Sequence, residues 1–111
     1  QPNAIYFGDK DLSFKNSSIY DSGNDQSYSV TVSDLDLDGD MDIVVANVQG
    51  SNSVFLNNNK GESWTKMSIG PEFNSYDIIV ADLNGDGRPD IIEANSDEQN
   101  VFHINAVKRN R

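Results

Sequence analysis

Two acidic segments of the chain carry oxygen-bearing side chains at alternate positions. Residues 34–42 read DLDLDGDMD and residues 82–90 read DLNGDGRPD. Alternation directs these side chains toward one centre, and the glycine at the sixth position permits a sharp turn. Calcium takes about six to eight oxygen ligands, so each segment is expected to wrap one calcium ion. The predicted ligands are Asp34, Asp36, Asp38, the carbonyl of Asp40 and Asp42 in the first segment, and Asp82, Asn84, Asp86, the carbonyl of Arg88 and Asp90 in the second.

Three other interpretations of these segments remain open. Asp, Asn and Gly are ordinary turn residues, so the segments could be solvated turns, although two matched copies favour ligands. A second alternative is that the segments bind magnesium, which is disfavoured because magnesium prefers to keep its own waters over a cage of protein ligands. The second segment also fits the EF-hand pattern, with Glu93 at the twelfth position, and dockerin modules use similar loops. Because the first segment has Val45 at that position and β-branched runs flank both, a helical calcium hand is the minor alternative.

The acidic segments belong to a longer internal repeat, whose offset is 48 from residue 34 to residue 82. An earlier partial copy is also present, since residues 3–8 (NAIYFG) resemble residues 52–57 (NSVFLN) and residues 13–19 (SFKNSSI) resemble residues 63–69 (SWTKMSI). One structural unit therefore recurs along the chain. The matched positions outside the acidic segments are Tyr28 and Tyr76, Val32 and Val80, Ile43 and Ile91, Ala46-Asn47 and Ala94-Asn95, and Asn52 and Asn100.

Each unit contains short β-branched runs that predict strands, and helical periodicity is not sustained anywhere. The runs are residues 29–32, 42–45, 54–56 and 64–69 in one unit and residues 77–80, 90–92 and 101–104 in the next. Four short strands in a unit of about 40 to 50 residues predict a β-propeller blade. We therefore expect an all-β fold of four-stranded antiparallel blades, with a partial blade at residues 3–28, a whole blade at 29–75 and a partial blade at 76–107.

Composition argues against several classes of function. The formal net charge is −10, and three of the eight basic residues lie in the last four positions, so a nucleic-acid partner is not expected. No apolar run approaches the ~20 residues that cross a bilayer, so membrane insertion is not expected. There is no cysteine and no Gly-x-Ser-x-Gly motif. His103, the single histidine, is predicted on the exposed face of a strand, so the chain is not expected to be an enzyme.

Aromatic residues at matched repeat positions have two interpretations. Phe14 and Trp64 occupy equivalent positions, as do Tyr28 and Tyr76. Such side chains could stack on a sugar, but equivalent positions in successive units favour packing between blades.

The motif D-x-[DN]-x-D-G-x-x-D, followed by a β-branched run and Ala-Asn, resembles the VCBS and FG-GAP repeats of integrin α-chain-type β-propellers and of many secreted bacterial proteins. The resemblance covers nearly the whole chain. It implies one structural calcium per blade, an extracellular, periplasmic or cell-surface location, and a role in adhesion, carbohydrate binding or scaffolding. A literal FG-GAP motif is absent, and the incomplete blades at both ends depart from a complete propeller.

The leading hypothesis is a non-enzymatic calcium-binding module that binds a glycan or protein ligand. An alternative is a purely structural propeller fragment or a self-assembling propeller subunit, because partial blades leave apolar faces and strand edges uncovered. These faces would be covered by self-association or by the remaining propeller repeats. A third, minor hypothesis is an enzyme that uses the propeller as a platform.

Overall fold

A computed structural model describes residues 3–21, 26–96 and 98–107, and within them the chain is all-β, as predicted. No helix occurs among these described residues, so none is present that could span a membrane. The strands are β1 (Asn3–Tyr6), β2 (Ser17–Asp21), β3 (Gln26–Ser33), β4 (Asp42–Val48), β5 (Asn52–Asn58), β6 (Ser63–Ile69), β7 (Ser75–Ala81), β8 (Asp90–Asn95) and β9 (Val101–His103).

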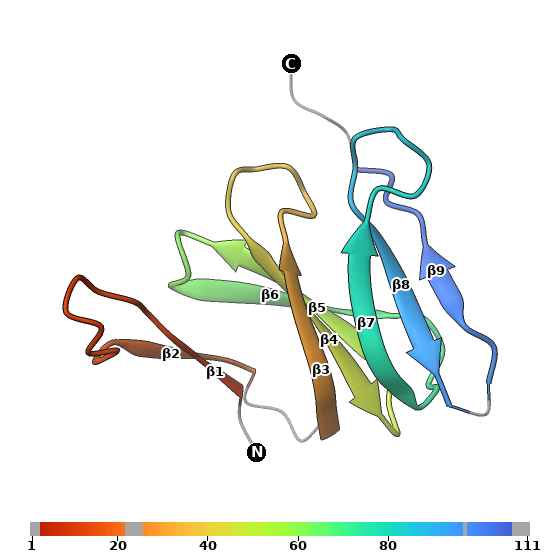
Figure 1. The fold of residues 1–111 in the computed structure, drawn as a ribbon, viewed down its shortest axis with the longest axis horizontal. Coiled ribbons are helices and arrows are strands. Elements are labelled where there is room, and N and C mark those ends of the chain that lie inside the picture. The colour runs from red at the N-terminus through yellow and green to blue at the C-terminus, as the bar shows by residue number, and fades with distance from the viewer. Residues whose placement is uncertain (1–2, 22–25, 97, 108–111) are drawn as a thin grey trace.

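The strands form three successive antiparallel sheets, each made from neighbouring strands in chain order (Figure 1). They contain β1-β2, then β3-β4-β5-β6, then β7-β8-β9, as expected for a partial blade, a whole blade and a second partial blade. The middle sheet begins at Gln26, not at residue 29, because β3 pairs with β4 as far as Gln26 opposite Val48. The third sheet begins at Ser75, opposite Asn95.

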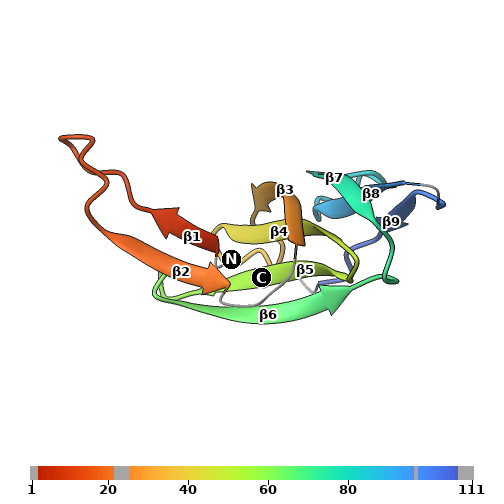
Figure 2. The ribbon, with the colours of Figure 1, turned by 90° about the horizontal axis from the view of Figure 1, so that it is seen from below.

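Strand β4 is the centre of the fold because both of its faces are covered. Ile43 and Val45 point to one side, where they cluster with Phe55 and pack against Ile5, Tyr20 and Trp64. Val44 and Ala46 point to the other side, where they join a cluster with Ile78 and Ile91 of the third sheet. A strand that is apolar on both faces requires a neighbour on each side. Figure 2 shows the middle sheet between the other two.

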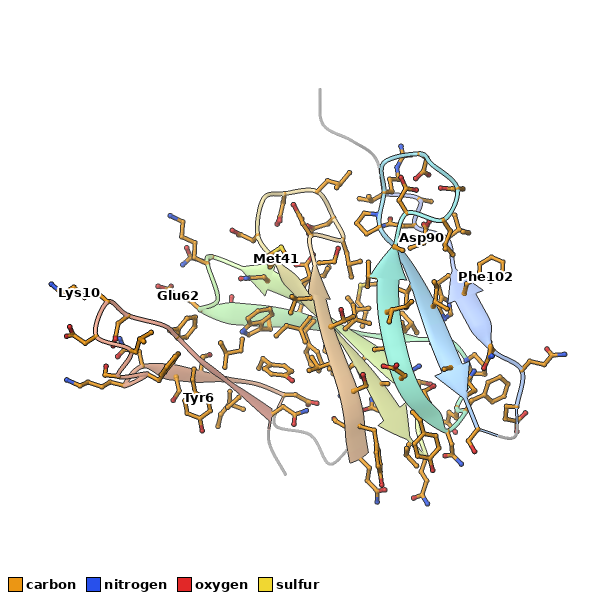
Figure 3. All side chains as sticks on the ribbon, viewed as in Figure 1. Tyr6, Lys10, Met41, Glu62, Asp90 and Phe102 are labelled. Carbon is orange, nitrogen blue, oxygen red and sulfur yellow. The ribbon has the colours of Figure 1, made fainter. Side chains whose placement is uncertain are left out.

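Comparing the exposure of equivalent residues in successive sheets shows which sheet faces have no neighbour. Val30 of β3 and Ile78 of β7 are equivalent, yet Val30 is 58% exposed and Ile78 is 2% exposed. Ile78 packs against the complete middle sheet, whereas the first sheet has only two strands. In the same way, Val54 of β5 is 4% exposed and its counterpart, Phe102 of β9, is 63% exposed on the outer side of the third sheet (Figure 3). The chain therefore presents two open apolar faces.

Polar side chains also link one sheet to the next in a repeated pattern. Asn3 Nδ2 donates to Ser27 Oγ at 3.0 Å, and Asn52 Nδ2 donates to Ser75 Oγ at 2.9 Å. Each serine in turn donates to an asparagine of its own sheet, Asn47 or Asn95. The same hydrogen-bonded step thus joins the first sheet to the second and the second to the third.

The structure tests the two pairs of aromatic residues that were expected between blades. Tyr28 and Tyr76 meet edge to face with ring centroids 5.3 Å apart and so join β3 to β7, which confirms that pair as an inter-sheet contact. Trp64 packs near Tyr20 of the first sheet. The expectation for Phe14 is wrong: this residue lies in the loop between β1 and β2 at a φ of 51°, and its side chain is exposed.

Replacing Val44 by Ala is expected to lower the free energy of unfolding by about 2 kcal/mol, because the lost methyl groups leave a cavity at the most enclosed strand. Val30→Ala removes the same atoms from an exposed site, so its effect should stay below about 0.5 kcal/mol. Urea denaturation of both variants, at low chain concentration and followed by circular dichroism, measures the difference. Equal losses would contradict the central position of β4.

Candidate metal centre

The two acidic segments form matching loops, one between β3 and β4 and the other between β7 and β8. Both loops lie at the same end of neighbouring sheets (Figure 1). Gly39 has a φ of 96° and Gly87 a φ of 84°, a left-handed conformation that glycine adopts without steric cost. The predicted role of the sixth position as the turning point is therefore confirmed.

In the first loop, two carboxylates organise the backbone. Asp34 accepts hydrogen bonds from the N–H groups of Asp38 at 3.1 Å and Gly39 at 2.8 Å. Asp42, which is fully buried, accepts from the N–H of Leu35 at 2.8 Å and from the N–H of Asn57 at 2.9 Å. The first carboxylate thus closes the loop on itself, while the last one ties the loop to the end of β5.

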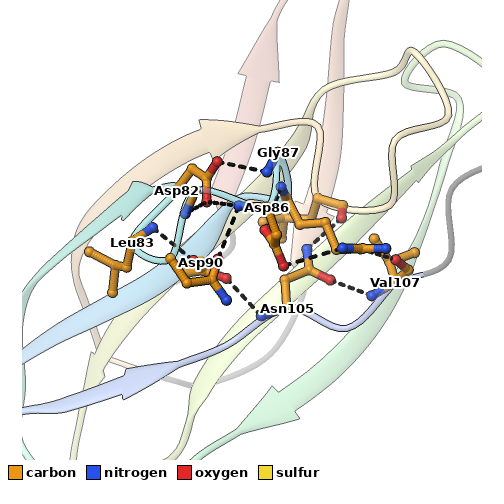
Figure 4. Close-up of polar contacts among 11 residues, drawn as sticks. Asp82, Leu83, Asp86, Gly87, Asp90, Asn105 and Val107 are labelled. Carbon is orange, nitrogen blue, oxygen red and sulfur yellow. Dashed lines mark hydrogen bonds and ion pairs between the residues drawn. The ribbon is translucent and has the colours of Figure 1, made fainter.

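The second loop repeats these contacts at the same offset (Figure 4). Asp82 accepts from Asp86 N at 3.2 Å and from Gly87 N at 2.7 Å. Asp90, again fully buried, accepts from Leu83 N at 2.8 Å and from Asn105 N at 2.8 Å. The repeat seen in the sequence is therefore also a repeat of hydrogen bonds.

Carboxylate oxygens converge in each loop. Oxygens of Asp34, Asp36 and Asp42 lie within 4.8 Å of one another, and so do oxygens of Asp82, Asp86 and Asp90. Like charges at this spacing repel, and a positive ion among them removes the repulsion. Six of the predicted ligand side chains are thereby brought together.

The remaining predicted ligands have other positions. Asp38 is exposed, and its Oδ1 accepts from Asp40 N at 2.9 Å. Asn84 lies between two carboxylates, with one amide atom 3.2 Å from Asp82 Oδ1 and 3.0 Å from Asp86 Oδ1. Turned with its nitrogen toward them, the amide donates two hydrogen bonds; turned with its oxygen toward them, it would add a neutral ligand to a cation. The side chain of Arg88, whose carbonyl was the predicted ligand, pairs with Asp86 at 3.2 Å.

The carboxylates of the first loop are electrostatically strained. Burial, then a hydrogen bond with Asp38 and the charge of Asp42, raise the pKa of Asp36 to about 6. Burial also raises the pKa of Asp42, against the lowering effect of the N–H groups that it accepts. Asp36 Oδ1 is buried and has no hydrogen-bond partner. An unpartnered carboxylate oxygen beside two other carboxylates fits the donor set of a hard divalent cation.

The second loop is less strained, because it contains a neutral residue and a nearby base. Asn84 stands where the first loop has Asp36. A hydrogen bond from the Arg88 N–H, supported by the Arg88 side chain, holds the pKa of Asp86 below its usual range. The two loops therefore share their geometry but differ in charge.

The helical calcium hand is wrong for this chain, because strands flank both loops. Glu93, the twelfth residue of the EF-hand pattern, is not a member of the carboxylate cluster and is fully buried. Its Oε1 lies 3.0 Å from Nε2 of His103. The expectation that His103 occupies an exposed strand face is also wrong, since the residue is half-buried beside this carboxylate. The apolar pattern around His103 does not reveal this partner, which comes from the adjacent strand β8.

Sequence reasoning missed Asn57 and Asn105. Their N–H groups complete the hydrogen bonding of the two buried carboxylates, Asp42 and Asp90. The signal was present, because both residues are asparagine and their separation equals the repeat offset. Their role as backbone donors, however, depends on the paths that β5 and the segment after β9 take beside the loops.

In protein stripped of divalent cations, the carboxyl group of Asp36 should titrate near pH 6, whereas that of Asp86 should titrate below the usual range. Because the folded-state pKa of Asp36 is raised, its contribution to stability is present below the unfolded value of about 4 and is lost as the pH rises through about 6. Carbon-13 NMR of the carboxyl groups measures both. An Asp36 midpoint near pH 4 would contradict the strained loop geometry.

Comparison with known families supports the repeat. A family model described as FG-GAP-like repeat matches residues 34–93, which is more than half of the chain. No curated protein matches significantly, and no solved structure does. The match begins at the first acidic residue of the first loop and ends just beyond the second loop, so it spans both candidate metal centres. The chain belongs to the FG-GAP-like repeat family and is a β-propeller-type repeat module.

Proposed function

We propose that the chain is a non-enzymatic binding module whose blades are stabilised by two structural calcium ions, one in each acidic loop. The observation that carries this proposal is the convergence of three carboxylates within 4.8 Å in each loop, of which the first and the last acid of the loop stand at equivalent repeat positions. In a turn that is merely solvated, the carboxylates would move apart because like charges repel, so three of them would not converge within each loop. Calcium suits these sites, because it accepts many carboxylate and carbonyl oxygens in flexible geometry, whereas magnesium keeps its waters.

The role of calcium would be structural. Asp42 and Asp90 are fully buried; a backbone N–H already joins Asp42 to β5, and another joins Asp90 to Asn105, just after β9. An ion held by the same carboxylate would fix the loop, the second strand and the third strand relative to one another. The family supports a module for adhesion, for carbohydrate binding or for protein binding, at an extracellular, periplasmic or cell-surface location.

A non-enzymatic role is supported by the contacts of the carboxylates and of the histidine that could act as catalytic acids or bases. Among the loop carboxylates, Asp34 and Asp90 accept hydrogen bonds from backbone N–H groups. The pair of Glu93 and His103 lies against Gly70 at the boundary of the second and third sheets. Neither arrangement combines a nucleophile, a base and an orienting group.

Calcium at millimolar concentration should raise the thermal unfolding midpoint of chelator-treated protein, because a ligand that binds only the folded state stabilises it. At a free calcium concentration 100 times the dissociation constant, each site would add about 2.7 kcal/mol. Far-UV circular dichroism follows the transition. An unchanged midpoint would contradict a structural role for calcium.

Asp34→Asn serves as the loop variant in this experiment, because the amide keeps one acceptor for the loop backbone but removes the charge. It should reduce the calcium-dependent rise, leaving the contribution of the second loop. Asp11→Asn is the matched control, since Asp11 is an exposed acid outside both loops. A control that lost as much as the loop variant would mean that calcium acts through general charge screening.

The two open apolar faces favour a second part of the proposal, which is self-association. The forward face, which is the side of the third sheet turned away from the middle sheet, contains Leu83, Phe102 and Ile104. The backward face, which is the side of the middle sheet turned away from the third sheet, contains Val30 and Val32. All five side chains are exposed. The covered counterparts of these faces, Leu35 and Val54 on one side and Ile78 and Val80 on the other, form the interface within the chain. Another blade of this repeat is therefore the shape that fits each open face, and a second copy of the chain offers one.

Sedimentation velocity should show concentration-dependent oligomers of the calcium-loaded chain. Val30→Asp and Phe102→Asp place a charge on the backward and forward face, respectively, and each should shift the distribution to monomer. Leu12→Asp is the control, because Leu12 is an exposed apolar residue in the loop between β1 and β2. A wild-type chain that stays monomeric at high concentration would contradict self-association.

A further inference from the structure

Asn105, two residues after β9, contacts both candidate metal loops. Its backbone N–H donates to Asp90 Oδ1 of the second loop at 2.8 Å (Figure 4). Its side-chain Nδ2 donates to the carbonyl of Leu35, in the first loop, at 2.7 Å. The two bonds reach loops of different sheets, so Asn105 spans the boundary between the blades.

On the side of the first loop, the contact leads directly to a predicted calcium ligand. Leu35 accepts from Asn105 through its carbonyl and donates through its N–H to Asp42 Oδ2 at 2.8 Å. Leu35 is also a buried member of the apolar cluster between the two sheets. A shift of Leu35 would therefore move a donor of Asp42 and disturb the packing at the same time.

On the side of the second loop, Asn105 is anchored twice. Besides its bond to Asp90, it accepts a hydrogen bond from Val107 N at Oδ1, at 2.8 Å. The carbonyl of Val107 accepts from Arg88 Nε, and Arg88 pairs with Asp86 at 3.2 Å. Two predicted ligands of the second loop, Asp86 and Asp90, thus hold the segment that contacts the first loop.

We propose that the two calcium loops are energetically coupled across the boundary between the blades and that Asn105 is the residue that couples them. This inference rests on the proposed calcium sites. Filling the second loop fixes Asp86 and Asp90, which hold Asn105 against Leu35 and so preorganise the donor to Asp42. The first ion to bind orders the contact between Asn105 and Leu35, so the second ion does not bear that entropic cost again. Calcium binding to the two loops is therefore positively cooperative, and the effect is reciprocal.

Asn57 is the matched control, because it occupies the equivalent position of the middle sheet without reaching another blade. Its N–H donates to Asp42 Oδ1 as that of Asn105 does to Asp90. Its side-chain Nδ2 donates to the carbonyl of Met41, at 2.9 Å, within the same loop. The coupling contact is therefore a property of Asn105 and not of every asparagine at this repeat position.

The test is a calcium titration followed by the amide NMR signals of Gly39 and Gly87, which donate to Asp34 and Asp82 and report each loop separately. Asp86→Ala disables the second loop. The coupling ratio is the Gly39 midpoint concentration in this variant divided by the midpoint with the second loop intact. We expect this ratio to be about fivefold larger with Asn105 than with Ala at the same position. Changes in loop charge are the same in both backgrounds and cancel.

Two further variants guard against a simple folding defect. Asn105→Asp keeps an acceptor for Val107 N but cannot donate to Leu35, so it should lose the coupling as Asn105→Ala does. Asn57→Ala should keep the wild-type coupling ratio, whatever its effect on the affinity of the first loop. An unchanged ratio in both Asn105 variants would overturn the inference while leaving calcium binding intact. Calcium-insensitive Gly39 and Gly87 signals would instead contradict the proposed function itself.

Discussion

The mutual repulsion of carboxylates is the constraint on which the rest of the structure depends. Each loop brings three of them within 4.8 Å. Two like charges at about 4 Å cost roughly 4 kcal/mol at the effective dielectric near a protein surface, a large share of a small domain's stability. The chain lowers this cost with backbone N–H donors and, in the first loop, with a raised pKa at Asp36. In the proposed function a cation removes the remainder.

The buried carboxylates connect this local constraint to the whole fold. Asp42 and Asp90 are the first residues of β4 and β8, so each joins its loop directly to a strand, and β4 carries the largest share of the core. From β4 the core extends in two directions, toward β2 through Phe55 and Tyr20, and toward β7 and β8 through Val44. A loop that loses its shape would therefore displace the first residue of a strand whose two faces hold neighbouring sheets. Calcium binding and blade packing are thus expected to rise and fall together.

The sequence was sufficient to predict the repeat, the strands and most of the loop geometry, because all three depend on short-range patterns. Alternating acids, a glycine at the turn and β-branched flanks act within nine or ten residues of one another. The pairing of Tyr28 with Tyr76 was also within reach, since equivalent positions in adjacent blades meet. The burial of individual side chains could not be predicted, because it depends on which neighbouring strands are present. Phe14 lies in the loop between the two strands of the first sheet and is exposed, although its repeat position suggested packing between blades.

Contacts between strands explain the other differences. His103 follows the alternation of an exposed strand position, but the strand beside it carries Glu93 at a buried site, and the pair replaces Phe55 and Val45 of the middle sheet. Asn105 looks like a turn residue by composition, and its importance emerges only when the third sheet is placed against the first loop. Specific departures from the repeat thus occur where one blade meets another.

A direct count of bound calcium tests the central claim most clearly. Equilibrium dialysis of the chelator-treated chain against radioactive calcium, at near-physiological ionic strength, gives the number of ions per chain without assuming any effect on stability. Two ions per chain at saturation, falling to one in Asp34→Asn, is the predicted result, since in the proposed function each cluster of three carboxylates would hold one ion. Binding that never saturates, or that is the same in Asp34→Asn, would contradict the claim and show that the acidic loops only attract a diffuse cloud of cations.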